Sequence, residues 1–531
     1  MIGTKYFSAL KREFTGYDAK KAQKDILAGL TCTAVALPLA LAFGVSSGAD
    51  AAAGLICAII AGLVIGMLSG ASYQLSGPTG AMAAILFGLV ATHGIEAMFF
   101  ASFLSGVFLL FFAVINAGKL VNFIPRSVVT GFTSGIAIII ALGQIDNAFG
   151  TVSQGGNAIE KVASYFTLGF HPRAYAVMFT VLSMAIMIFW PKKAQKIVPG
   201  SLMAIVICLI VNMIFKFDVG VVGEIPRTLL PEARLNFRGV DYSQIGTYIS
   251  SGFSIAVLGM VESLLCGASA GKMKNEKLDN RQELIAQGVG NVIIPFFGGV
   301  PATAAIARTS VAIKSGGQTR LVSVWHAVGL LLSMFLLGPW MAQIPLAALS
   351  GVLLVTAWRM NDMGEIKLMF GRRLKTSIAQ FLVTMIATVV FDLTVAILLG
   401  VVLSIILFVI RLRTELEIDR EKVPEKPYAT ILNVAGALFF ATQEKLPFYV
   451  DRAKEDGYTT IVLNLRGALQ IDHSAADELL SIYRDAKRQG VRIVFTGITK
   501  YNDLTLTRTE FFNEVSEEDI DGSELEAYES I

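Results

Sequence analysis

Residues 295–313, PFFGGVPATAAIARTSVAI, decide the fold, because two prolines and two glycines interrupt an otherwise apolar run. A helix needs about 20 residues to cross a bilayer, and the segment after Pro301 is too short for that. We therefore expect a helix that begins near Pro301, inside the membrane. Its first backbone N–H groups would have no partners there, which is tolerated only where they line a cavity or meet a ligand. An anion is the natural ligand at the N-terminus of a helix.

A second stretch has the same pattern. Residues 75–86, LSGPTGAMAAIL, contain a Gly-Pro pair followed by small residues. Short apolar segments broken by glycine and proline, one in each half of a chain, are the best sequence indication of a transporter's binding site. The alternative is that both stretches are ordinary kinks or re-entrant loops that bind no solute.

The composition is that of an integral membrane protein. Of the 531 residues, 54% are hydrophobic and 16% are charged, whereas soluble domains carry about 25% charged residues. From about Arg411 onward, charged residues return at the density of a soluble protein, so a polar domain follows the membrane domain. The net charge of +3 gives no reason to expect nucleic acid as a partner.

The start of the chain indicates the membrane topology, and the cysteines do not indicate a chemical role. Residues 1–24 form a basic lead, which the positive-inside rule places in the cytoplasm. The four cysteines lie in apolar stretches without metal-like spacing, so we expect no metal, no disulfide and no cofactor. Nucleophile elbows, P-loops and metal-binding motifs are missing, so we do not expect an enzyme.

The apolar spans form two sets of about seven, separated by a polar link at 216–248. The broken segment is third in each set, which predicts two repeats, about 25–215 and 249–411, within a transmembrane domain at 25–411. An odd number of segments per repeat inverts the second repeat, so the two half-helices would meet tip to tip. The other expected spans are 25–46, 52–71, 95–117, 124–143, 174–190, 199–215, 249–270, 281–297, 321–338, 343–358, 374–391 and 393–411.

The polar part of the chain has the alternation of strands and helices that indicates a small α/β domain. We expect this domain at 427–515, followed by a solvated acidic tail at 516–531. Ser474 is a good candidate for a helix N-cap. The expected elements are strands at 427–440, 459–466 and 491–497, and an amphipathic helix at 474–489.

Several stretches resemble the SulP family of anion transporters, the sulfate-permease type. The resemblance covers nearly the whole chain. It implies an inverted repeat of about fourteen segments with a core domain that moves against a gate domain, a cytoplasmic C-terminal STAS domain, and a homodimer in the cell membrane. The stretches are DILAGLTCTAVALPLALAFG at 25–44, LSGPTGAMAAIL at 75–86, PRSVVTGFTSGIAIIIALGQI at 125–145, VESLLCGASAGKM at 261–273, ELIAQGVGNVIIPFFGGVPATAAIARTSVAIKSGGQTRL at 283–321 and DLTVAILLGVVLSIILF at 392–408.

The resemblance also implies the site residues. The family's anion site lies between the third and tenth segments, flanked by the first and eighth. Leu39 and Ala307 replace polar residues of relatives, which leaves the identity of the anion open. In related STAS proteins a serine at the strand-to-helix loop is phosphorylated, so Ser474 is either a regulatory phosphosite or only a cap. Carried onto this chain, the substrate-binding candidates are Phe43, Thr79, Gly80, Ala81, Thr303, Ala304, Ala305 and Arg308.

Glu262 is the only carboxylate deep inside a long apolar span, where an ionised group costs roughly 2.5 kcal/mol or more. Burial favours the protonated form of a carboxyl group, so Glu262 is the candidate for ion coupling. Cys266 stands one helical turn away, where a sodium-coupled relative would be expected to supply a hydroxyl oxygen, and this favours H+ over Na+. The alternative is a structural pair with Arg308 or a lysine.

Arg308 lies about two turns into the second half-helix, where its charge would add to the helix dipole in attracting an anion. Its alternative role is a structural tether. Together these features predict a secondary active transporter of bicarbonate, sulfate or a C4-dicarboxylate, working by proton-coupled symport and an elevator-type movement. The alternatives are a sodium-coupled bicarbonate symporter, a passive anion exchanger or channel, and a membrane sensor that signals through the STAS domain.

Overall fold

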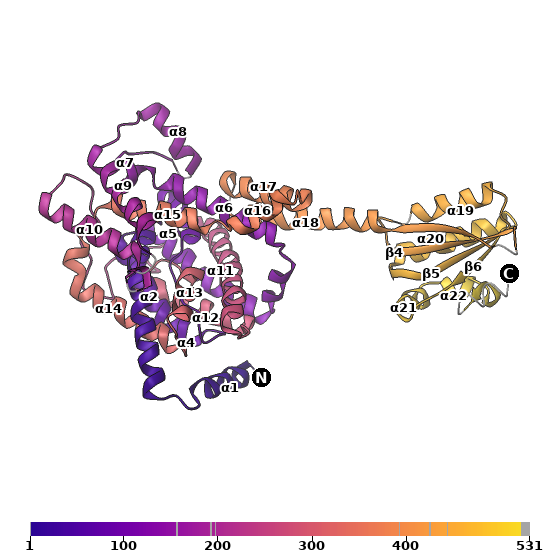
Figure 1. Ribbon diagram of the computed structural model, residues 1–531, viewed down its shortest axis with the longest axis horizontal. Coiled ribbons are helices and arrows are strands. Elements are labelled where there is room, and N and C mark those ends of the chain that lie inside the picture. The colour runs from indigo at the N-terminus through magenta and orange to yellow at the C-terminus, as the bar shows by residue number, and fades with distance from the viewer. Residues whose placement is uncertain are drawn as a thin grey trace. The chain divides into compact units, whose positions relative to one another are not determined.

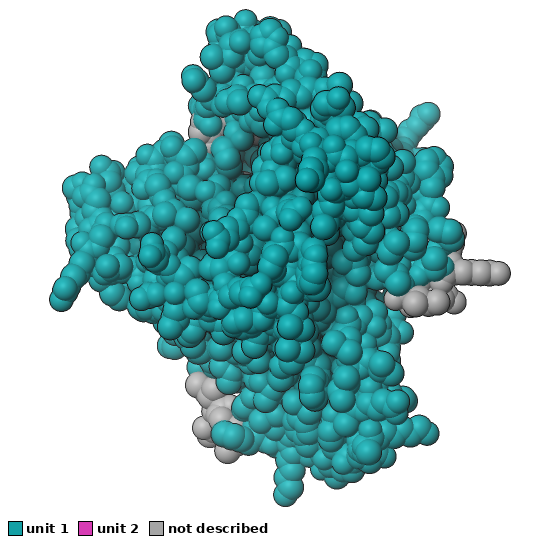
Figure 2. All heavy atoms as spheres, turned by 90° about the vertical axis from the view of Figure 1, so that its left-hand side faces the viewer, with its two compact units in different colours: residues 1–401 teal, residues 402–531 magenta. Residues whose placement is uncertain are grey.

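The computed structural model describes residues 2–155, 158–191, 194–196, 198–391, 393–423, 426–442 and 444–521. The chain forms two compact units, unit 1 at Met1–Val401 and unit 2 at Val402–Ile531. Unit 1 is helical, and unit 2 contains a five-stranded sheet (Figure 1). The face of unit 1 drawn in Figure 2 is furrowed and divided into lobes.

The first half of unit 1 follows the predicted order of segments. After a long helix come an interrupted helix, a two-residue strand, and a helix that bends at Gly94, where φ is 82°. The bend divides that helix into the predicted half-helix and the next span. The elements are α1 Ile2–Phe14, α2 Ala19–Ser46, α3 Ala51–Ile60, η1 Ala61–Ile65, α4 Gly66–Leu68, β1 Ser76–Gly77, α5 Gly80–Val114, η2 Ala117–Phe123, α6 Arg126–Gly143, α7 Ile145–Phe149, α8 Ala158–Leu168, α9 Ala174–Phe189, η3 Ala194–Lys196 and α10 Gly200–Phe215.

The second half repeats this order, with a long helix, a shorter interrupted helix, a two-residue strand and a half-helix. The predicted architecture of two sets of about seven membrane segments is confirmed. The elements are η4 Tyr242–Gln244, α11 Ile245–Lys274, α12 Asn280–Ile293, η5 Ile294–Phe297, β2 Thr303–Ala304, α13 Ile306–Lys314, α14 Leu321–Met341, α15 Leu346–Met360, α16 Met363–Gly371, α17 Lys375–Val390 and α18 Leu393–Glu415.

Among the described residues, 6 helices are long and apolar enough to cross a membrane, judged by length and composition. Further apolar helices of 10–17 residues, such as α9, α10 and α15, accompany them. These helices agree with a protein that passes through the membrane several times.

The helices of unit 1 pack in two groups. One group contains α2, α3, α5, α11, α12, α13 and α14, and the other contains α6, α7, α9, α10, α15 and α17. The groups touch where α2 meets α10 and α15 and where α5 meets α6. The helices that carry Phe43 and Gly80 therefore lie at the boundary between the groups.

The predicted start of the second half-helix near Pro301 is wrong. The chain is extended after Pro301, and α13 begins only at Ile306. The reason is that β2 forms a ladder with β1, and this ladder satisfies backbone groups that a helix would otherwise have to satisfy.

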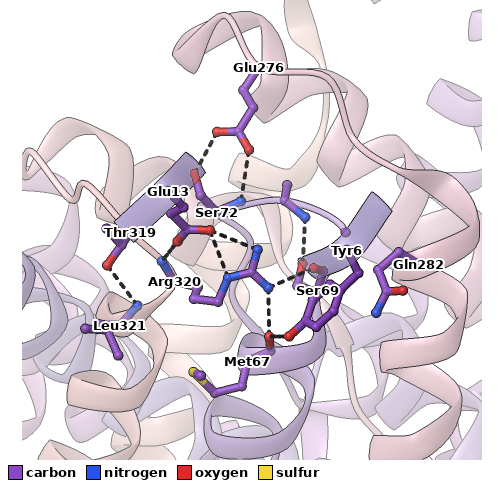
Figure 3. Close-up of polar contacts among 12 residues, drawn as sticks. Tyr6, Glu13, Met67, Ser69, Ser72, Glu276, Gln282, Thr319, Arg320 and Leu321 are labelled. Atoms are coloured by element: carbon purple, nitrogen blue, oxygen red, sulfur yellow. Dashed lines mark hydrogen bonds and ion pairs between the residues drawn. The ribbon is translucent and has the colours of Figure 1, made fainter. Parts of the chain in front are cut away.

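The N-terminal lead is bound to unit 1 by a buried ion pair between α1 and the start of α14 (Figure 3). Glu13 Oε2 lies 2.9 Å from Nη2 of Arg320, and the two side chains are 8% and 3% exposed. Arg320 Nη1 also donates to the Met67 carbonyl at 2.7 Å, as does the Tyr6 hydroxyl. The lead is therefore part of the folded unit.

Unit 2 is an α/β domain with strand order β3-β4-β5-β6-β7. Strands β3 and β4 are antiparallel, and the other neighbouring pairs are parallel. The prediction of a small α/β domain is confirmed, although several elements were not foreseen. The elements are β3 Glu417–Lys422, β4 Ala429–Leu438, α19 Lys445–Glu455, β5 Thr460–Ile471, α20 His473–Arg488, β6 Arg492–Thr496, α21 Lys500–Arg508, α22 Phe511–Glu514, η6 Glu517–Asp519 and β7 Ile520–Asp521.

The sheet of unit 2 extends beyond the predicted boundaries of 427 and 515. Strand β3 precedes residue 427, and β7 pairs with β6 after residue 515. Asp519 accepts from Arg492 Nε at 2.9 Å and from the Tyr483 hydroxyl at 2.7 Å, so the first residues of the predicted solvated tail pack on the domain. The rest of that tail, residues 522–531, lies outside the described residues.

The residue that caps α20 is Asp472, not Ser474. Its carboxylate accepts from the Ala475 backbone N–H at 2.9 Å. Ser474 lies in the first turn of α20 and is half-buried.

Candidate functional site

The two broken segments meet directly. Strand β1 pairs antiparallel with β2, with Ser76 opposite Ala304 and Gly77 opposite Thr303. Helices α5 and α13 therefore start from opposite sides of one two-stranded junction, and the prediction that the half-helices meet is confirmed.

Helix α12 supports this junction with buried polar side chains. Asn291 accepts from the Ala302 N–H at 2.7 Å and donates to the Ala302 carbonyl at 2.9 Å. One turn earlier, Gln287 Nε2 donates to Ser76 Oγ at 2.7 Å and to Glu283 Oε1 at 2.8 Å. None of these three residues was predicted from the sequence. Their spacing of four was the available signal, because it places all three on one face of a helix.

Arg308 reaches from α13 across the junction to the other broken segment. It is 1% exposed, and its Nη2 donates to the Pro78 carbonyl. Its Nε and Nη1 are buried and have no hydrogen-bond partner among the described residues. Buried donors are nearly always satisfied, so these two nitrogens need an acceptor that the described residues do not supply.

The first turns of both half-helices add further donors. In the part of the chain that the structure describes, no acceptor is recorded for the backbone N–H groups of Gly80 and Ala81 in α5, nor for those of Ile306 and Ala307 in α13. The N-terminus of a helix also carries a partial positive charge. The junction therefore combines free N–H groups with a buried guanidinium group.

Helix α11 contacts both arms of the junction through two consecutive residues. The Thr79 hydroxyl donates to Glu262 Oε2 at 3.0 Å. Ser263 Oγ lies 2.8 Å from Thr303 Oγ1 and accepts from the Ala304 N–H at 3.2 Å. Among the described residues, no ion pair of Glu262 with an arginine or lysine is recorded, which argues against a purely structural pairing.

A cavity of about 420 Å³ lies beside the start of α5. It is lined by Phe43 and Gly80, and also by residues of α6, α8, α11 and α17. Thr79 and Ala81 lie behind this wall, with exposed fractions of 7% and 0%. Thr303, Ala304, Ala305 and Arg308 do not line it, so the structure separates the predicted set into a cavity wall and a layer behind it.

Comparison with known proteins agrees with this architecture. Residues 23–387 match the sulfate permease family, and residues 421–527 match the STAS domain. YvdB of Bacillus subtilis (strain 168) is 33% identical over 523 residues, which cover 95% of this chain and 97% of YvdB.

Two further proteins extend the comparison. The bicarbonate transporter BicA of Picosynechococcus sp. (strain ATCC 27264 / PCC 7002 / PR-6) is 33% identical over 343 residues, covering 62% of this chain and 60% of BicA. The solved structure of SLC26A9 has a TM-score of 0.83 at 17% identity, covers 99% of this chain and 94% of that one, and shows the same fold. The chain is a multi-pass membrane protein that belongs to the sulfate permease family and carries a C-terminal STAS domain.

Proposed function

We propose that this protein is a secondary active transporter of small inorganic or organic anions, with sulfate and bicarbonate as the first candidates. The observation that carries the proposal is the buried Arg308, whose Nε and Nη1 have no protein acceptor in the described residues. An anion at the junction would accept from these nitrogens and from the free N–H groups at the start of α5. The helix dipole alone contributes about 0.3 to 1 kcal/mol, or up to about 2 when partly buried, so Arg308 is the stronger attractor.

The choice of candidate anions follows from the relatives. The family is named for sulfate permeases, and BicA is named a bicarbonate transporter. Both anions are small oxyanions that accept several hydrogen bonds. A C4-dicarboxylate offers similar carboxylate oxygens and is the third candidate.

For coupling, we propose that Glu262 binds and releases a proton during each cycle. Its contact with Thr79 supports this role, because Thr79 belongs to the same turn as Gly80 of the cavity wall. Protonation of Glu262 would then change its hydrogen bond with Thr79 at the start of α5. Coupling to Na+ is the alternative.

For the transport cycle, we propose that the group containing α2, α5 and α11 moves against the group containing α6, α9 and α15. Phe43 and Gly80 lie at this boundary, as an elevator-type movement requires. With the basic N-terminal lead and the STAS domain in the cytoplasm, the cavity at the far end of α2 would open to the outside.

Transport by the full-length protein in proteoliposomes tests the proposal. Labelled sulfate, bicarbonate and a C4-dicarboxylate are supplied in turn, under an imposed inward H+ gradient or an inward Na+ gradient. We expect accumulation of at least one anion, driven by the H+ gradient. Uptake driven only by Na+ would replace proton coupling, and absence of uptake under both gradients would contradict anion transport.

A further inference from the structure

Lys161, near the start of α8, lies where two hollows of unit 1 meet. It lines the cavity of about 420 Å³ that reaches Phe43 and Gly80, and also a neighbouring hollow of about 640 Å³. Its side chain is only 10% exposed. Removing an ammonium group from water costs free energy, so neighbouring groups must stabilise the charge of Lys161.

Two contacts offset the cost of burying this ammonium group, and neither of them is a hydrogen bond donated by Nζ. Nζ lies 3.5 Å from the centre of the Phe87 ring and 3.9 Å from Oδ2 of Asp146. An aromatic face attracts a cation, and 3.9 Å exceeds the distance of a hydrogen bond. Within the described ranges, Nζ has no hydrogen-bond acceptor. The N–H groups that do not face the Phe87 ring are therefore available to a ligand.

Asp146 is held by other partners. Its Oδ1 accepts from the Tyr165 hydroxyl at 2.8 Å, and its Oδ2 accepts from Ser153 Oγ at 2.5 Å. Asp146 thus offsets part of the cost of burying the Lys161 charge, while its oxygens are occupied by hydroxyl donors. An incoming anion would not have to displace a Lys161–Asp146 hydrogen bond.

The cavity between Lys161 and Gly80 suits an anion. No carboxylate is among the described residues that line it, whereas Asp146 lines the neighbouring hollow beside Lys161. Lys161 supplies donors at one place in this cavity, and the start of α5 supplies backbone donors at another. A volume of about 420 Å³ also has room for an anion with several waters, since one water occupies about 30 Å³.

We propose that Lys161 is an outer docking site for the transported anion, a proposal that rests on the anion transport proposed above. A small oxyanion accepts hydrogen bonds from the Lys161 ammonium group and then passes through the cavity to the start of α5 at Gly80. The lysine raises the local concentration of anion at the cavity and does not take part in the later steps. Its removal therefore lowers apparent affinity and leaves the maximal rate unchanged.

Three variants of the full chain test this site by initial uptake of labelled sulfate and bicarbonate into right-side-out membrane vesicles. Lys161→Gln removes the charge, Lys161→Arg keeps it, and Lys216→Gln is the matched control at an exposed lysine that does not line either hollow. We expect KM to rise about tenfold in Lys161→Gln, in line with the lower range of electrostatic effects on association. The maximal rate should stay constant, and Lys161→Arg and Lys216→Gln should resemble wild type. The KM difference should shrink as ionic strength rises.

An unchanged KM in Lys161→Gln would overturn the docking site, and so would an equal loss of maximal rate in Lys161→Gln and Lys161→Arg, which indicates a structural role. A binding measurement separates this outcome from failure of the proposed function. Sulfate and bicarbonate are titrated against the purified protein, and the shift in Tm is recorded. If anion raises the Tm of wild type, and Lys161→Gln needs about tenfold more anion for the same rise in Tm, the docking site is supported even without measured transport. If anion raises the Tm of both proteins equally, the docking site is refuted while anion binding stands. If the Tm of neither protein changes, the proposed function fails and the docking site fails with it.

Discussion

The guanidinium group of Arg308 donates to the Pro78 carbonyl, so a side chain from the second half of the chain closes on the broken segment of the first half. The two residues are separated by 230 positions in sequence. Because Nε and Nη1 of Arg308 have no acceptor in the described structure, this contact orients the guanidinium group and leaves two of its nitrogens without a partner.

Arg308→Lys should strongly weaken anion uptake while the protein stays folded. Lysine keeps the charge but cannot contact Pro78 and a ligand with separate, fixed donors. Loss of a hydrogen bond to a charged ligand costs about 1.5 to 3 kcal/mol, which is roughly 10- to 150-fold in affinity. Anion uptake measures this, and Lys314→Gln, an exposed lysine on the same helix, is the control. Uptake near the wild-type level in Arg308→Lys would remove Arg308 from the site.

Gly77→Ala should displace Arg308. A Cβ atom at Gly77 would lie 2.0 Å from Nη1 of Arg308, a distance that forces the guanidinium group to move. Overpacking of this kind costs about 1 to 3 kcal/mol, so we expect a lower Tm together with weaker anion binding. Gly246→Ala is the control, because its added Cβ would meet nothing within 4 Å. Equal anion affinity in both variants would contradict the prediction.

Glu262→Gln should uncouple transport from the proton gradient. The amide keeps an oxygen that can accept from Thr79, so the local geometry is preserved, but the side chain no longer titrates. We expect an imposed pH gradient to stop accelerating uptake, while exchange of labelled for unlabelled anion continues. A pH-driven rate equal to that of wild type would rule out Glu262 as the coupling group.

Asn291→Ala should destabilise the junction. Both the N–H and the carbonyl of the buried Ala302 would lose their partner, and each unsatisfied group costs about 1 to 3 kcal/mol. Asn291→Asp loses the donor to the carbonyl and adds a buried carboxyl group, so its Tm should also fall below that of wild type. Thermal unfolding of the purified proteins measures both changes, and a Tm of Asn291→Ala equal to that of wild type would show that the contact is dispensable.

Glu13→Ala should destabilise unit 1 although Glu13 belongs to the N-terminal lead. Breaking a buried ion pair leaves the Arg320 charge partly uncompensated, which costs about 3 to 5 kcal/mol. Glu13→Ala combined with Arg320→Met should recover part of this loss, because the unpaired charge is removed as well. A Tm for the double variant below that of Glu13→Ala would contradict this explanation.

The sequence predicted the elements of the site better than their connections. Broken apolar stretches at 75–86 and 295–313 predicted two half-helices, and Glu262 was distinguished by its place in an apolar span. The predicted helix start near Pro301 is wrong because pairing with β1 keeps the chain extended to Ala305. The partner strand lies more than two hundred residues away, so no local signal indicates it.

Composition and segment order by themselves determined the membrane class, the two repeats and the α/β domain, because hydrophobic spans and glycine or proline breaks are local properties of the chain. Only the tertiary structure decided that Thr79 contacts Glu262, that α12 supports the junction, and that Lys161 meets the cavity beside Phe43 and Gly80. These relationships depend on how distant segments pack, and long-range contacts are set by the whole fold rather than by the residues on either side.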